Sequence, residues 1–162
     1  MQGALYRARK VSLATWLLPL VLVLAMLAGC TVRLAPDYDG SIVESLQKVN
    51  EEAMVFFASI SDGTGGKPFT SRATDYANIV GKLDALNIAV SARTTPPNPL
   101  APDKAVAAPP SAGSIAQASN VLTTMRSIDE RQKLNAAEVS IFKERFASSI
   151  GYALFYEKGL QR

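Results

Sequence analysis

The chain contains no histidine and only one cysteine, Cys30, among its 162 residues. Without histidine it lacks both the usual general base near neutral pH and the commonest transition-metal ligand. A single cysteine cannot form a disulfide within the chain, and zinc sites built from histidine and cysteine are excluded within one chain. We therefore expect a protein that is not an enzyme, with no catalytic residue and no metal site.

The chain after the first 29 residues also lacks an excess of positive or negative charge. The whole chain has 17 Lys and Arg against 14 Asp and Glu, with an isoelectric point near 9.1. Three of the positive residues are Arg7, Arg9 and Lys10, and no acidic residue precedes Cys30. The remaining chain is therefore balanced, and its composition predicts no nucleic-acid partner.

The one long hydrophobic run lies at residues 11–28, directly after these basic residues. A basic start, an apolar centre and small residues at the end are typical of a secretory signal. Because positive charges stay on the cytoplasmic side, the chain that follows is predicted to be exported. A run of about 18 residues is also just long enough to span a bilayer uncleaved, and that alternative stays open.

The run ends in Leu27-Ala28-Gly29-Cys30, which resembles the lipobox of bacterial lipoproteins. The resemblance implies a diacylglycerol on the Cys30 thiol and cleavage between Gly29 and Cys30. In many Gram-negative bacteria it also implies an acyl chain, palmitate being typical, on the new amino group. In such proteins an Asp directly after the cysteine tends to retain the protein at the inner membrane. Here that residue is Thr31, so the resemblance favours the periplasmic face of the outer membrane. The alternative is that Cys30 is an ordinary thiol.

The resemblance covers the first 30 residues alone, and the rest of the chain resembles no family. Two or more acyl chains hold a protein firmly at a membrane, since each buried methylene contributes about 0.8 kcal/mol. No cofactor is expected besides this covalent lipid. We predict a signal peptide at residues 1–29, a lipidated tether at 30–40 and a helical domain at 41–162.

Apolar residues of the predicted domain recur every three or four positions, as on one face of a helix. Sequence patterns typical of capping boxes predict helices that begin at Ser41, Ser114 and Asn135, and a further helix is predicted over residues 71–93. One long bent helix from Ser114 onward is the alternative to a separate start at Asn135. The first is expected to stop at Gly63 and the last near Lys158. The Pro- and Ala-rich residues 94–113 predict an exposed connection. The fold class is therefore all-α, a small four-helix bundle with the order of its helices left open.

Several suggestive motifs have simpler explanations. Gly66-Lys67 lacks the glycine and hydroxyl spacing of a phosphate-binding loop, so no nucleotide is expected. The acidic pair Glu51-Glu52 and the charged run at residues 129–133 are interpreted as solvated surface. Aromatic side chains in the second half of the first helix and near the end of the last one are interpreted mainly as core. They are Phe56, Phe57, Tyr152, Phe155 and Tyr156.

Two functions fit these observations. The favoured one is a non-catalytic, membrane-anchored module that binds another envelope protein or itself, with its partner-binding residues unknown. The alternative is a binder of a small apolar ligand or lipid between the helices. An oversized interior lined by Phe56, Phe142 and Phe146 would favour the ligand binder. A filled core with an exposed aromatic patch would favour the interaction module.

Overall fold

A computed structural model describes residues 35–93 and 108–161 of the chain. These residues form the helices α2 (Gly40–Ser59), α3 (Ala73–Ser91), α4 (Pro110–Arg131) and α5 (Ala136–Gly159), with a short 3-10 turn at Phe69–Ser71. Within the two described ranges there is no strand, and the predicted all-α class is confirmed. None of these four helices is both long and apolar enough to cross a membrane. The predicted signal peptide, with Gly29 and Cys30, lies outside the described residues.

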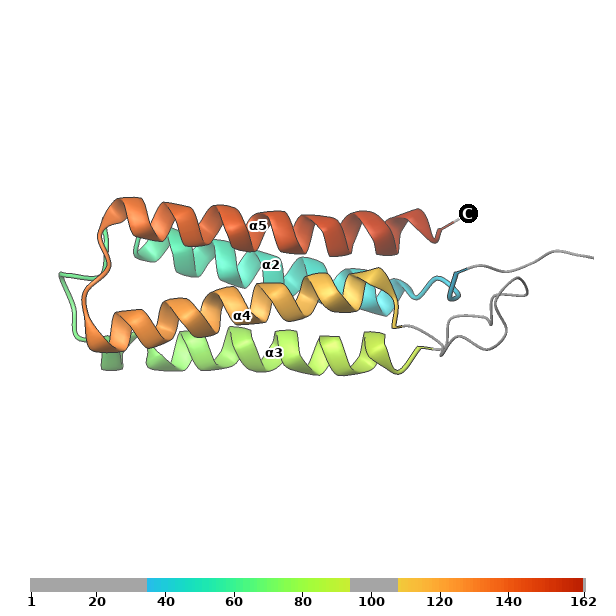
Figure 1. Cartoon of the computed structure of the whole chain (residues 1–162), viewed down its shortest axis with the longest axis horizontal. Coiled ribbons are helices and arrows are strands. Elements are labelled where there is room, and N and C mark those ends of the chain that lie inside the picture. Colours follow the sequence, from blue (N-terminus) through green and yellow to red (C-terminus); the bar gives the residue numbers. More distant parts are fainter. Residues whose placement is uncertain (1–34, 94–107, 162) are drawn as a thin grey trace, which may run out of the picture. The chain divides into compact units, whose positions relative to one another are not determined.

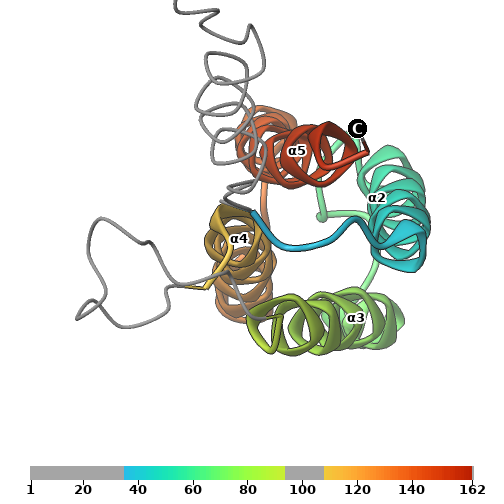
Figure 2. The same ribbon diagram turned by 90° about the vertical axis from the view of Figure 1, so that its right-hand side faces the viewer.

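The helices run alternately up and down, so that each is antiparallel to the next along the chain (Figure 1). Seen along their axes they stand at the corners of a square, with α5 beside α2 and α4, and α3 diagonally opposite α5 (Figure 2). This is the simple up-down-up-down four-helix bundle. The direction of α4 relative to α3, which the sequence left open, is antiparallel.

The predicted apolar stripes meet on the axis of this bundle. One continuous cluster includes the fully buried Leu46, Leu83, Leu122 and Phe146, one from each helix. Burial of a side chain of this size stabilises a fold by about 1.5–3 kcal/mol. The shared core is therefore what holds together four helices that would be marginal in isolation.

Two helix starts differ from the prediction. Asp39 caps α2, because its Oδ1 accepts a hydrogen bond from the Ser41 backbone N–H at 2.9 Å, so the predicted cap at Ser41 is wrong. Helix α4 begins at Pro110, not at Ser114, and residues 110–113 of the predicted connection form its first turn. Proline suits that position because the first N–H of a helix has no partner within the helix. Residues 94–107 of the connection lie outside the described residues.

The start of α5 is confirmed. The side chain of Asn135 accepts a hydrogen bond from the Glu138 N–H at 3.0 Å, and Glu138 accepts one from the Asn135 N–H at 2.8 Å. This reciprocal pair is the predicted capping box. The ends of two helices differ slightly, since α2 ends at Ser59, four residues before Gly63, and α5 runs through Gly159.

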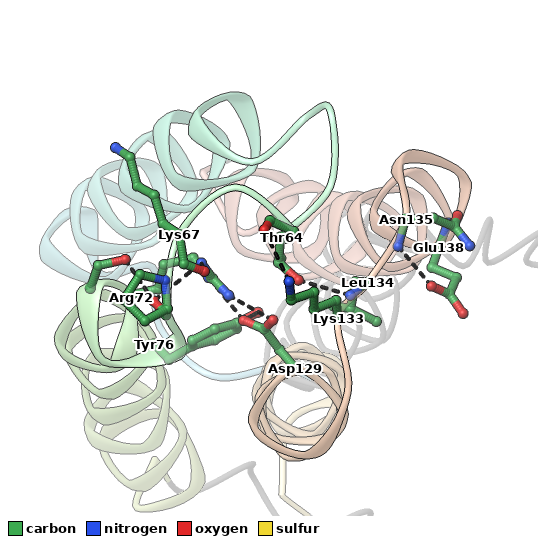
Figure 3. Close-up of polar contacts among 12 residues, drawn as sticks. Thr64, Lys67, Arg72, Tyr76, Asp129, Lys133, Leu134, Asn135 and Glu138 are labelled. Carbon is green, nitrogen blue, oxygen red and sulfur yellow. Dashed lines mark hydrogen bonds and ion pairs between the residues drawn. The ribbon is translucent and has the colours of Figure 1, made fainter.

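The α2–α3 loop is joined to the α4–α5 loop at one end of the bundle (Figure 3). The Thr64 N–H donates to the Leu134 carbonyl at 2.8 Å, and the Leu134 N–H donates to Thr64 Oγ1 at 2.8 Å. Just before Thr64, Gly63 has a φ of +99°, in the region that side-chain-bearing residues rarely adopt. A Cβ at Gly63 would lie 2.7 Å from the Leu134 carbonyl oxygen. The join between the loops therefore depends on a glycine at this position.

We expect Gly63→Ala to lower the free energy of unfolding by about 1–3 kcal/mol, because it combines backbone strain with a steric clash against the other loop. The measurement is the denaturation midpoint in urea with an unchanged slope. Gly66→Ala is the matched control, since a Cβ there meets nothing within 4 Å. An equal midpoint for the two variants would contradict the assigned role of Gly63.

Candidate interaction site

A buried ion pair lies at the end of the bundle where the two loops join (Figure 3). Arg72 donates from Nε to one Asp129 oxygen at 2.9 Å and from Nη2 to the other at 2.8 Å. Arg72 is 6% exposed and Asp129 5%, so the interpretation of residues 129–133 as wholly solvated surface is wrong for Asp129. The Arg72 Nη1 donates to the backbone carbonyls of Lys67 and Pro68. The guanidinium thus ties the loop before α3 to the end of α4.

Tyr76 completes this cluster from the core side. Its ring is fully buried, and its hydroxyl donates to Asp129 Oδ2 at 3.4 Å. Burial, reinforced by the negative charge of Asp129, raises the pKa of Tyr76 well above its ordinary value. The phenol therefore stays protonated and acts as a hydrogen-bond donor. Because the polar groups of the cluster face one another and are shielded from solvent, its geometry suits a structural brace rather than a site open to substrate.

A second buried carboxylate, Glu157, lies at the opposite end of the bundle. It is 0% exposed, and its two oxygens accept hydrogen bonds from Arg93 Nη1 and from Ser111 Oγ, both at 2.6 Å. Arg93 also donates from Nη2 to the backbone carbonyl of Asp37, just before α2. These contacts join the segment before α2 and the ends of α3, α4 and α5. Glu157 therefore closes this end of the bundle as Asp129 closes the other.

The aromatic residues at the end of α5 are divided between the core side and solvent. Tyr156 is half-buried, whereas Tyr152 is 71% exposed and Phe155 is 80% exposed. The interpretation of Tyr152 and Phe155 as core is therefore wrong. On α5 the buried residues Ile150, Ala153 and Glu157 recur at helical spacing, and the two exposed rings fall out of phase with them.

Tyr152 and Phe155, together with Ile141 at 49% exposure, lie on the outward side of α5, and we call this surface the α5 outer face. Small side chains make it concave between the large ones. One hollow of about 360 Å³ is lined by Ala147, Ser148, Gly151, Tyr152 and Phe155. A second hollow of about 390 Å³ lies towards α4 and includes Ser114, Arg145, Ser148 and Tyr152. The Tyr152 ring therefore stands between two depressions, a shape that suits interlocking with another side-chain surface.

The other residues considered from the sequence are accounted for by packing or by surface charge. Phe56 and Phe146 are buried, and the Phe146 ring packs against Phe57 with centroids 5.7 Å apart. Phe142 packs at the edge of the same core. Glu51 and Glu52 lie in an open groove between α2 and α3, where Glu52 forms an ion pair with Lys82. The aromatic rings thus fill the interior at these positions.

Across residues 35–93 and 108–161, no cluster of three or more Asp, Glu, Cys or His side chains could hold a metal ion. No protein-family model, no curated protein and no solved structure matches the chain. The α5 outer face gathers three of the large apolar side chains that packing leaves exposed among the described residues, Ile141, Tyr152 and Phe155. Large exposed apolar side chains gathered on one surface are typical of a site that another molecule covers.

Proposed function

We propose that this protein is a bacterial envelope lipoprotein whose helical domain is a non-catalytic protein-interaction module. The observation that carries the interaction role is the α5 outer face, where Tyr152 and Phe155 remain exposed although the core beneath them is filled. In this proposal the diacylglycerol on Cys30 is the anchor, and the domain works at the periplasmic face of the outer membrane. Apart from the lipid no cofactor takes part.

The residue types of the α5 outer face support a binding role. Tyrosine and arginine are enriched among the residues that contribute most to binding energy, and aromatic residues are enriched at interfaces generally. Arg145 and Tyr152 line the same hollow, and Phe155 lies one turn further along α5. Such side chains bind best where a partner fills the depressions beside them and excludes water.

The buried charges support a role without catalysis. Arg72 and Asp129 satisfy each other in a bidentate pair, and Glu157 is engaged by Arg93 and Ser111. Groups that act on a substrate need to reach its reacting atoms within hydrogen-bond distance. The best-formed polar clusters of the described residues are instead enclosed by the ends of the helices, where they stabilise the bundle.

A photo-activatable amino acid placed at Phe155 in the native cell envelope tests the interaction role. We expect a crosslinked product whose mass exceeds that of the protein alone, because the site lies within the covered surface. The matched control is the same substitution at Ile88, which is 71% exposed but lies on α3. No product at either position, or equal products at both, would contradict a binding role for the α5 outer face.

A further inference from the structure

The two large apolar residues Ile141 and Phe155 of the α5 outer face are exposed and lie at equal distances along the helix on either side of Ser148. Starting from Ala137, the outermost positions of this face follow at intervals of four, three, four, four, three and four residues, as the 3.6-residue turn of an α-helix dictates. They are Ala137, Ile141, Glu144, Ser148, Tyr152, Phe155 and Gly159, and every one of them is exposed. Ser148 lies midway between the core residues Phe146 and Ile150, so at 3.6 residues per turn it points directly away from the core.

We propose that a second copy of this chain covers the α5 outer face, with the two α5 helices antiparallel and crossing at Ser148. This inference rests on the proposed interaction role and names the partner. The symmetric spacing places Ile141 of each copy against Phe155 of the other, so the same apolar contact forms twice. A two-fold interface requires this kind of self-complementary surface.

The charges on this face favour the antiparallel direction. In a parallel pair Ile141, Ser148 and Phe155 would meet their own copies, and the flanking Glu144 would lie close to the like charge of its own copy. In the antiparallel pair Glu144 instead lies beside the small Gly151 of the other copy. Arg145 lies beside the other copy's Tyr152, where a guanidinium can stack on the aromatic face. Like charges are therefore separated in the antiparallel pair and brought together in the parallel pair.

The small residues at the crossing point allow the helices to approach. Ser148, Ala147 and Gly151 line the hollow beside Phe155, and a Cβ built at Gly151 meets nothing within 4 Å. Helices that pack through side chains lie about 8–10 Å apart, and small residues at the crossing favour the shorter distance. The bulky side chains then flank the crossing instead of obstructing it.

The area available is that of a weak, reversible dimer. A covered Tyr or Phe side chain contributes about 150–250 Å², and Tyr152 and Phe155 are 71% and 80% exposed. With Ile141 and the flanking residues, and counting both copies, the interface buries on the order of 1,000 Å², at the lower limit for a specific contact. In each copy α2 begins at the end of the bundle where α5 ends (Figure 1). An antiparallel pair therefore has the starts of its two α2 helices at opposite ends. Both copies can be anchored in one bilayer when their helices lie along the membrane plane.

Variants of the full chain that each carry one cysteine in addition to Cys30, studied in detergent, test the pairing and its direction. In the antiparallel pair Ala137 faces Gly159 of the other copy, and neither residue supplies the apolar contacts. We expect a mixture of Ala137→Cys and Gly159→Cys to form a disulfide-linked heterodimer under mild oxidation. Each variant alone is expected to stay at the background of the parent, which carries Cys30 only. Linkage of each variant to itself would indicate a parallel pair and overturn the proposal.

Two further variants separate pairing from accidental contact. Adding Phe155→Arg to both cysteine variants is expected to abolish the heterodimer, whereas adding Ile88→Arg is expected to leave it unchanged. Both side chains are largely exposed, so a retained helical circular dichroism signal checks that the fold survives. A heterodimer insensitive to Phe155→Arg would overturn the proposal. The absence of a crosslink above background would also overturn the proposal. It would do so even if monomers were found to bind phospholipid vesicles through Phe155. If photo-crosslinking at Phe155 then captures a different protein, the interaction role stands without self-pairing.

Discussion

Replacing Asp129 with alanine is expected to lower the free energy of unfolding by about 3–5 kcal/mol, because it leaves a buried guanidinium without its counter-ion. The Arg72 side chain is 8% exposed and loses the partners of both Nε and Nη2. The Tyr76 hydroxyl loses its acceptor as well. Since domains are stable by only about 5–15 kcal/mol, the loss is a large share of the total. Urea denaturation followed by circular dichroism measures it.

The neighbouring Glu130→Ala provides the matched control, because Glu130 is exposed on the same turn of α4. A double variant, Arg72→Met with Asp129→Leu, should be more stable than Asp129→Ala, since apolar residues of similar volume often replace a buried pair at little cost. Equal stability of Asp129→Ala and Glu130→Ala would show that the ion pair contributes nothing. A double variant as unstable as Asp129→Ala would show that packing, and not the unpaired charge, explains the loss.

The sequence predicted the four helices because each carries a long, regular apolar stripe. It missed the starts of α2 and α4 because the residues that begin helices are also typical of loops. Asp39 and Gly40 resemble part of a turn, and Pro110 follows a run of prolines although proline is favoured in the first turn of a helix. Asn135 was predicted correctly because a capping box has two members at a fixed spacing, which makes the pattern more specific.

The buried charges were missed because a charged residue at a helix end is usually solvated. A signal was nevertheless present, since Asp129 continues the α4 stripe of Leu122 and Met125 at helical spacing. Glu157 continues the α5 stripe in the same way after Ala153. A carboxylate in phase with the core face marks a buried position, but its partner cannot be read from the chain. Arg72 lies 57 residues from Asp129, and only the packed bundle brings them together.

The same reasoning explains the error about the α5 outer face. Tyr152 and Phe155 were assigned to the core by residue type, although their phase along α5 places them away from Ile150 and Ala153. Phase is the stronger criterion on a helix of this length, because core positions recur every three or four residues. An aromatic residue out of phase with a regular stripe is therefore better interpreted as exposed surface than as core.

For the membrane anchor, we expect Cys30→Ser to abolish both lipid attachment and signal cleavage. Serine lacks the thiol that would carry the diacylglycerol, so the 29-residue signal should remain on the chain. Cells supplied with an alkyne-labelled fatty acid should label the parent protein and leave the variant unlabelled. Intact mass should report a shortened, acylated parent and a full-length, unmodified variant. Thr31→Ser is the matched control and should be labelled and cleaved like the parent.

Mass and labelling are the decisive measurements, because membrane fractionation cannot separate the two cases. The apolar residues 11–28 of an uncleaved signal are long enough to hold the variant at a bilayer by themselves. A parent protein that begins at Met1 with an unmodified Cys30 would remove the anchor from the proposed function. The exposed face of α5 would still be there for a partner to cover, because that face depends on the fold of residues 35–93 and 108–161 and not on the lipid.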